Sequence, residues 1–173
     1  MPRPILNIAD VEFRKVGHGT NFPGAESAPE KFQAQLGDIG RRLGAQKLGY
    51  NITIVPPGKR AFPFHNHRAN EEMFLVLEGS GEVRIGSETY PIRTGDVIAH
   101  PPGGPETAHQ IVNNSQAELK YLAVSTRISP EIAEYPESLK FGVYAEYPAE
   151  DGKPRGFRFV NRVGASINYY DGE

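Results

Sequence analysis

Short apolar runs separated by turn residues dominate the pattern of hydrophobic and polar positions along this chain. Residues 48–55, 73–77 and 119–125 are rich in aromatic and β-branched side chains, which favour strands. Strand-like runs recur about every 8–12 residues, and Gly, Pro and Asn, the residues that tight turns require, lie between them. The pattern predicts an all-β sandwich or barrel, with residues 119–125 as a central strand.

The segments outside these runs give mixed patterns. Over residues 28–44 helical spacing of apolar positions competes with three glycines, and we expect a short helical turn followed by extended structure. Residues 129–131, Ser-Pro-Glu, resemble an N-cap, a first-turn proline and an acidic first turn, which predicts a short helix over 130–135. Residues 157–160 and 167–170 are typical of edge strands that extend the sheet or wrap around a neighbour.

Two histidines and a glutamate lie where a hairpin would bring them together. His65 and His67 are two residues apart, so in an extended segment their side chains project from the same face. A turn over residues 68–70 would return Glu72 to their side, at the start of the 73–77 run. Most His and Glu residues on strands are surface residues, but a carboxylate that leads into an apolar strand is costly without a partner. Two imidazoles and a carboxylate on a rigid sheet indicate a site for a divalent transition metal.

Composition limits the chemistry and the number of domains. The 173 residues, 38% hydrophobic and 23% charged, fit one globular domain. We expect this single domain, 1–173, to have a core barrel over about 46–126, an N-terminal arm with extra strands over 1–45 and a C-terminal extension over 127–173. The chain has no cysteine, so thiolate ligands and disulfides are excluded and any metal is held by nitrogen and oxygen.

Charge and hydropathy argue against two classes of partner. The net charge of −2 and the isoelectric point near 6.2 give no general attraction to nucleic acid or to an anionic membrane. No apolar segment is long enough to span a bilayer, and no N-terminal run resembles a signal peptide. We therefore expect a cytoplasmic protein that binds neither nucleic acid nor membrane.

Two motifs with defined spacing lie in the middle of the chain. The first consists of Gly58, His65, His67, Glu72 and Gly79, and the second of Gly95, Pro101, Gly103, His109 and Asn113. Together they resemble the two motifs of the cupin superfamily, whose members are small jelly-roll barrels. The chain has one additional residue before His65 and three additional residues before His109.

The resemblance implies a fold, a ligand set and a cofactor. The fold is a double-stranded β-helix, or jelly-roll barrel, with little helix. The implied metal ligands are His65, His67, Glu72 and His109, which would hold one divalent ion of Fe, Mn, Zn, Ni or Co and leave open positions for a small-molecule ligand. The candidate residues of the surrounding substrate pocket are Tyr50, Phe74, His100, Glu106 and Ile111.

The family has many functions, so the fold alone does not select one. The complete ligand set favours a metal-dependent enzyme that acts on a small polar metabolite, with oxygenase-type chemistry as the first hypothesis. A sugar or sugar-phosphate isomerase or epimerase is the second. Lys59, Arg60 and Arg68 flank the first motif and could meet a phosphate, although each alone is more typical of a solvated edge. A non-catalytic binding or sensing protein is the third.

One apolar face of the 73–77 strand needs cover. Met73, Leu75 and Leu77 lie opposite to Glu72, on the face that a metal site would not use. A second copy of the chain could supply the cover, and the long segments at both ends then favour a homodimer with exchanged strands. The alternative is that the terminal segments of the same chain cover this face.

Overall fold

A computed structural model of the chain describes residues 4–21, 27–148 and 154–173. Over these ranges the regular structure consists of strands and short 3-10 turns, without an α-helix. The strands are β1 (Arg14–Gly17), β2 (Gln33–Asp38), β3 (Leu48–Val55), β4 (Asn66–His67), β5 (Glu72–Glu78), β6 (Ser80–Ile85), β7 (Glu88–Arg93), β8 (Val97–His100), β9 (His109–Val112), β10 (Leu119–Thr126), β11 (Glu131–Tyr135), β12 (Lys140–Pro148) and β13 (Pro154–Arg162). The all-β prediction is confirmed.

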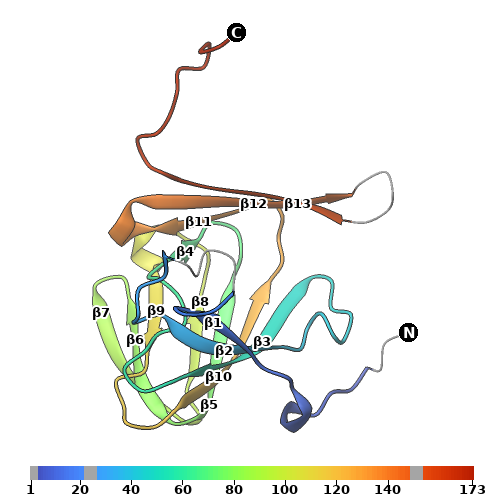
Figure 1. Cartoon of the computed structure of the whole chain (residues 1–173), viewed down its shortest axis with the longest axis vertical. Helices are drawn as coiled ribbons and strands as arrows, with labels where there is room; N and C mark the ends of the chain where they lie inside the picture. Colours follow the sequence, from blue (N-terminus) through green and yellow to red (C-terminus); the bar gives the residue numbers. More distant parts are fainter. Residues whose placement is uncertain (1–3, 22–26, 149–153) are drawn as a thin grey trace.

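The strands form three antiparallel sheets. The largest has the order β1-β2-β3-β10-β5-β8, the second β13-β12-β11-β4 and the third β7-β6-β9. β10 lies inside the largest sheet, between β3 and β5, as the apolar run over 119–125 predicts. Figure 1 shows β11, β12 and β13 crossing one end of the barrel, with the residues after β13 leading away from it.

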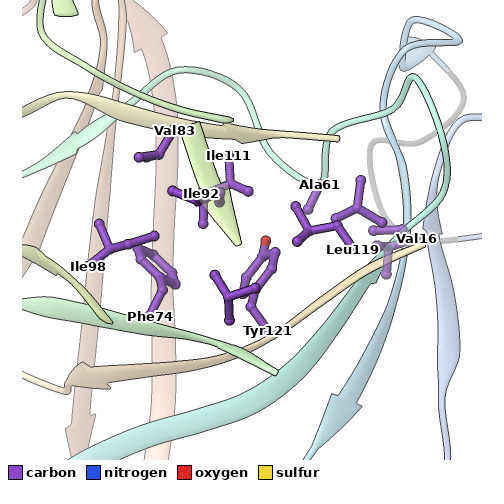
Figure 2. Packing of buried hydrophobic residues seen from close by; sticks show 12 residues of the cluster. Val16, Ala61, Phe74, Val83, Ile92, Ile98, Ile111, Leu119 and Tyr121 are labelled. Carbon is purple, nitrogen blue, oxygen red and sulfur yellow. The ribbon is translucent and has the colours of Figure 1, made fainter. Parts of the chain in front are cut away.

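The barrel core comes from alternate residues of strands in two sheets. Phe74 on β5, Ile111 on β9 and Tyr121 on β10 are buried in one cluster with Ile92 and Ile98. Their side chains point toward one another in Figure 2. Successive residues of a strand face opposite ways, so this packing leaves the neighbours of Phe74 and Tyr121 on the other face of the sheet.

The N-terminal segment covers much of that other face. Val11 and Ile39 are buried against Ile52 of β3, and Leu77 of β5 packs against the same cluster. The chain therefore supplies its own cover for Leu77, one of the three apolar residues that the sequence analysis places on this face. Strand β2 confirms the extended structure expected between residues 28 and 44.

A motif glycine makes the tight connection between β5 and β6. Gly79 has φ +84°, a left-handed conformation that L side chains rarely adopt. A Cβ atom at this position would also lie 2.3 Å from the carbonyl oxygen of Glu118, so the turn accepts only glycine. Its role in the motif is structural.

The helix predicted over 130–135 is wrong, because residues 131–135 form strand β11. β11 pairs with β12 on one edge and with β4 on the other. Ile132 is exposed between the buried Glu131 and Ala133, which is the two-residue period of a strand. Pairing with two partners distant in the sequence overrides the local resemblance to a helix start.

The predicted hairpin between His65–His67 and Glu72 is also wrong in its pairing. β4 has only two residues and pairs with β11, whereas β5 pairs with β10 and β8. Both edges of β5 are occupied, so β4 has no edge of β5 available to it. Glu72 nevertheless returns to the two histidines, as the next subsection describes.

The end of the chain presents apolar side chains to solvent. On β13 the exposed fractions of Phe157, Phe159 and Val160 are 50%, 45% and 43%, and beyond it those of Tyr169 and Tyr170 are 88% and 76%. Residues 157–160 belong to a strand as predicted, but residues 167–170 do not. Among the described residues no helix has the length and apolar character needed to span a membrane.

Candidate metal centre

Three histidines come together because their backbone segments pair or follow one another. The amide of His65 donates to the carbonyl oxygen of His109 at 3.1 Å, and the amide of His109 donates to that of His65 at 2.7 Å. This bridge leaves the two ring centroids 4.7 Å apart. The ring centroid of His67, on β4, lies 5.0 Å from that of His65. The three imidazoles therefore border one small volume.

Glu72 is the first residue of β5 and places its carboxylate in the same volume. Its Oε2 lies 3.0 Å from Nε2 of His109 and 3.4 Å from Nε2 of His67. One ligand atom from each of His65, His67 and Glu72 lies within 4.8 Å of the others. These three residues form a group that could hold a metal ion, and His109 borders it directly.

The hydrogen bonding of these side chains fits a bound cation. The ring nitrogens of His67 and His109 are buried and have no hydrogen bond of correct geometry within the described part of the chain, although Glu72 is close. Nδ1 of His65 lies 2.8 Å from the carbonyl oxygen of Pro63, which leaves Nε2 as its available ligand atom. Buried imidazole nitrogens beside a carboxylate, without ordinary hydrogen bonds, are suitable donors for a divalent transition metal.

Burial and neighbouring charges give the site groups different pKa values. Burial, together with His109, lowers the pKa of His65 from 6.5 to about 4. Burial also acts to lower the pKa of His67, but Glu72 and Glu131 outweigh it and raise this pKa above 6.5. Burial by itself would raise the pKa of Glu72, but the contacts from His109 and His67 hold it below its usual 4.5. At neutral pH Glu72 is therefore charged and His65 neutral, the forms that bind metal.

A cavity of about 230 Å³ lies over the ligand group. Of the predicted pocket residues, Phe74 and Ile111 line it. Asn51, Gln110 and Tyr121 add three neutral polar side chains that the sequence analysis does not identify. No Lys or Arg in the described ranges lines this cavity, so its wall is uncharged apart from the ligand group.

The other predicted pocket residues lie outside the cavity. His100 is buried behind the ligands, with its ring stacked on that of His109 at 3.9 Å between centroids, and burial followed by His109 lowers its pKa to about 3. Tyr50 packs on the opposite face of β3, because its neighbour Asn51 is the residue that faces the cavity. Glu106 turns back into its own loop, where its carboxylate accepts a hydrogen bond from the amide of Gly104 at 2.8 Å.

The basic residues around the first motif have partners elsewhere. Lys59 forms an ion pair with Glu30 at 3.2 Å, and Arg68 forms one with Glu134 at 2.9 Å. Arg60 donates to the side-chain oxygen of Gln110 at 3.2 Å. None of the three basic side chains lines the cavity.

The sequence resembles those of known proteins over its central part. Residues 51–125 match the family profile of the cupin domain. An uncharacterised protein of Methanocaldococcus jannaschii is 36% identical over 72 residues, which are 42% of this chain and 54% of that protein. The chain thus spans about half the length of this curated relative. The oxalate-binding protein of Thermotoga maritima is 27% identical over 120 residues, which are 64% of this chain and 96% of that protein.

A solved structure resembles the chain over nearly its whole length. It is a sugar phosphate isomerase of the cupin superfamily from Silicibacter pomeroyi, with a TM-score of 0.73 and 24% sequence identity. The similarity covers 97% of this chain and 98% of the other. At this level of identity the comparison concerns the fold, and it includes the segments on both sides of residues 51–125.

Proposed function

We propose that this chain, whose residues 51–125 match the cupin-domain profile, binds one divalent transition-metal ion and acts on a small polar metabolite. The observation that carries the proposal is the convergence of His65, His67 and Glu72, with His109 beside them, on one cavity. A barrel that only served as a scaffold would have no need for buried imidazoles that lack hydrogen-bond partners.

In this proposal His65, His67, His109 and Glu72 hold the ion. Ligands of this type suit Fe, Mn, Zn, Ni or Co, and four of them leave up to two positions of an octahedral ion open. When bound, the ion supplies Lewis acidity toward a substrate oxygen and a site at which oxygen chemistry is possible. The protein contributes rigid positioning, because three of the four residues lie on paired strands.

We favour oxygenase-type chemistry among the possible reactions. Phe74 and Ile111 give the cavity apolar walls, which exclude water from reactive species. The phenol of Tyr121 is buried, and burial raises its pKa well above the usual 10. Tyr121 therefore stays protonated and is able to donate a hydrogen bond to a substrate oxygen, while Asn51 offers a second neutral contact.

Two alternatives make different demands on the cavity. A non-catalytic binding protein gains support from the oxalate-binding relative, whose name refers to binding and not to turnover. A sugar-phosphate isomerase needs a cation for the phosphate group, and the described lining of the metal cavity contains neither Lys nor Arg. An isomerase that acts on an unphosphorylated sugar does not meet this objection.

Metal analysis and oxygen uptake separate these functions. We expect the purified chain to carry about one equivalent of a transition metal, and to consume oxygen when Fe(II) and small 2-oxo acids, dicarboxylates or diols are supplied. Ligand binding without consumption would instead indicate the binding protein, and stabilisation by sugar phosphates without consumption would indicate the isomerase. A chain that holds no metal, and takes up no oxygen when Fe(II) is added, contradicts the proposal.

We also propose that the protein forms a homodimer. The support is the apolar surface on both β13 and the residues after it, including Phe157, Phe159 and Tyr169, which are about half exposed or more. A second copy would bury these side chains reciprocally across a twofold axis. Sedimentation velocity tests this directly, and a monomer at micromolar concentration would end the proposal.

A further inference from the structure

We propose that Glu131 is a positioning residue for the metal centre, although it lies outside the region that matches the cupin profile. The inference rests on the proposed metal site. Glu131 is the first residue of β11, and it is 7% exposed. A carboxylate buried to this extent is costly unless it is fully bonded, so its partners define its role.

Those partners are residues 68–70, in the loop between the candidate ligands His67 and Glu72. Oε1 of Glu131 accepts hydrogen bonds from the amides of Arg68 at 3.0 Å and Ala69 at 3.3 Å. Oε2 accepts from the amide of Asn70 at 2.7 Å and also from the Asn70 side chain. The carboxylate thus binds three successive amides of the segment that joins His67 to Glu72. Displacement of this segment would move both ligands.

Glu131 also faces the imidazole of His67. Its Oε2 lies 3.8 Å from Nδ1 of His67, while Glu72 Oε2 lies 3.4 Å from Nε2 of the same ring. With a cation bound, the charge of Glu72 would be engaged at the site, and the negative charge of Glu131 near Nδ1 would favour the tautomer that carries its proton there and leaves Nε2 as the lone-pair donor. A ligand imidazole commonly has a carboxylate on its other nitrogen, which sets its orientation and increases its basicity.

A purely structural role predicts a different result. In that case Glu131 would join the loop to β11 and contribute to stability without an effect on metal binding. Glu134, on the same strand, is a matched control, because it bonds the side chains of Asn66 and Arg68 on both sides of His67. No ion pair in the described structure joins Glu134 to an imidazole. Removal of its charge therefore weakens bonds to the residues beside His67 but leaves the contacts of His67 itself unchanged.

The experiment compares Glu131→Gln with Glu134→Gln in the full chain. The glutamine side chain in the first variant would keep the size and one acceptor oxygen but lose the charge. Titration calorimetry with Co(II) or Zn(II) alone gives the affinity, the visible spectrum of the Co(II) form reports the geometry of the ligands, and circular dichroism without metal checks the fold. We expect Glu131→Gln to weaken metal binding about 10–100-fold and to change the Co(II) spectrum, and Glu134→Gln to leave both as in the wild type.

Each outcome decides the inference. Wild-type affinity and spectrum in a folded Glu131→Gln protein would overturn it, as would equal losses in both variants. If Glu131→Gln does not fold, Glu131→Asp replaces it, and the same loss relative to Glu134→Asp is expected because the shorter carboxylate cannot reach both the loop and His67. Wild-type protein that binds no metal overturns the proposed function together with this inference, whereas a failure confined to Glu131 leaves the proposed function intact.

Discussion

Strands β11 and β13 belong to one sheet, and both lie outside the matched cupin region, but they contact very different surroundings. β11 pairs with β4, the strand that carries His67, and buries Glu131. β13 pairs with β12 along its length and leaves both its faces exposed between residues 155 and 160. The two strands are separated by β12 alone.

The difference divides the C-terminal extension into two parts with separate contacts. β11 contacts the candidate ligands at both ends, through Glu131 beside His67 and through Tyr135, whose ring stacks on His65 with centroids 6.0 Å apart. β13 and the residues after it expose apolar surface. Within the described structure they make no hydrogen bond, ion pair or ring contact with the ligand group. The first part therefore contacts the candidate metal centre, whereas the second leaves its apolar surface exposed.

The largest effect is expected where β11 contacts a ligand directly. His67→Ala removes one of the candidate donors, and we expect metal affinity to fall by more than about 100-fold, beyond the range typical of outer contacts. Titration calorimetry with Zn(II) measures the change. His18→Ala is the control, because His18 is exposed, bonds the carbonyl oxygen of Ala28 and does not line the metal cavity. Equal affinities for the two variants would remove His67 from the ligand set.

The next largest effect, on stability, is expected for the hydrogen bonds that join Asn70 to the segment leading into β11. The Asn70 side chain accepts from the amide of Ile128 at 2.6 Å and from Thr126 Oγ1 at 2.9 Å, and it donates to Glu131. Asn70→Ala removes these bonds and takes the side-chain acceptor from the partly buried amide of Ile128 and hydroxyl of Thr126, so we expect it to lower the free energy of unfolding by about 1–3 kcal/mol.

Asn161→Ala provides the matching change on β13. The Asn161 side chain accepts only from the amide of the next residue within the described structure, so we expect a loss below about 0.5 kcal/mol. Urea unfolding of both variants without metal makes the comparison. Similar losses would mean that β13 is held as firmly as the start of β11, and the division into two parts would be wrong.

The sequence predicts the strands and side-chain groups that depend on neighbouring residues. It does not predict those that depend on partners distant in the chain. Alternation and turn residues predict β3, β5, β9 and β10, and the motif spacing predicts the group of His65, His67 and Glu72 that the structure brings together. Along β3, Tyr50 and Ile52 share one face and Asn51 and Thr53 share the other. Alternation by itself does not show which of these faces meets the cavity, so Tyr50 is a reasonable pocket candidate from sequence.

Glu131 gives no such signal. It lies 61 residues after Asn70, and the surrounding Ser-Pro-Glu pattern indicates a helix start when only local rules are used. Its role depends on a strand pairing between β4 and β11, which involves two residues of β4 and cannot be recognised from periodicity. The candidate ligands are thus predictable from the sequence, but the residue that bonds the loop between them is not.

A smaller effect on stability is expected from Glu134, the second carboxylate on β11. Burial acts to raise the pKa of Glu134, but hydrogen bonds from Arg68 and Asn66 outweigh it and hold this pKa below the usual 4.5. Because the charged form is favoured in the folded state, its stabilisation is present above about pH 4.5 and is lost as the pH falls through the lower folded value.

Thermal unfolding as a function of pH tests this contribution. We expect Glu134→Gln to lower the unfolding midpoint by at most about 2 °C at pH 7, since the pair with Arg68 is partly exposed. The difference from the wild type should shrink below about pH 4.5. A difference that persists unchanged at about pH 3 would mean that the carboxyl group contributes through packing and not through its charge.

The smallest effect on stability is expected at the end of the chain, after β13. Residues 164–173 are exposed throughout, so their deletion should change the free energy of unfolding by less than about 0.5 kcal/mol and leave Zn(II) affinity unaltered. The same deletion removes Tyr169 and Tyr170, whose exposed rings would be buried in the proposed homodimer, and sedimentation velocity should then show a shift toward monomer. Tyr90→Ala, which removes a half-exposed ring on β7 in a different sheet, should leave the dimer in place. A truncated chain that loses several kcal/mol would show that residues 164–173 stabilise their own barrel, and these residues could then no longer be treated as a surface left over for a partner.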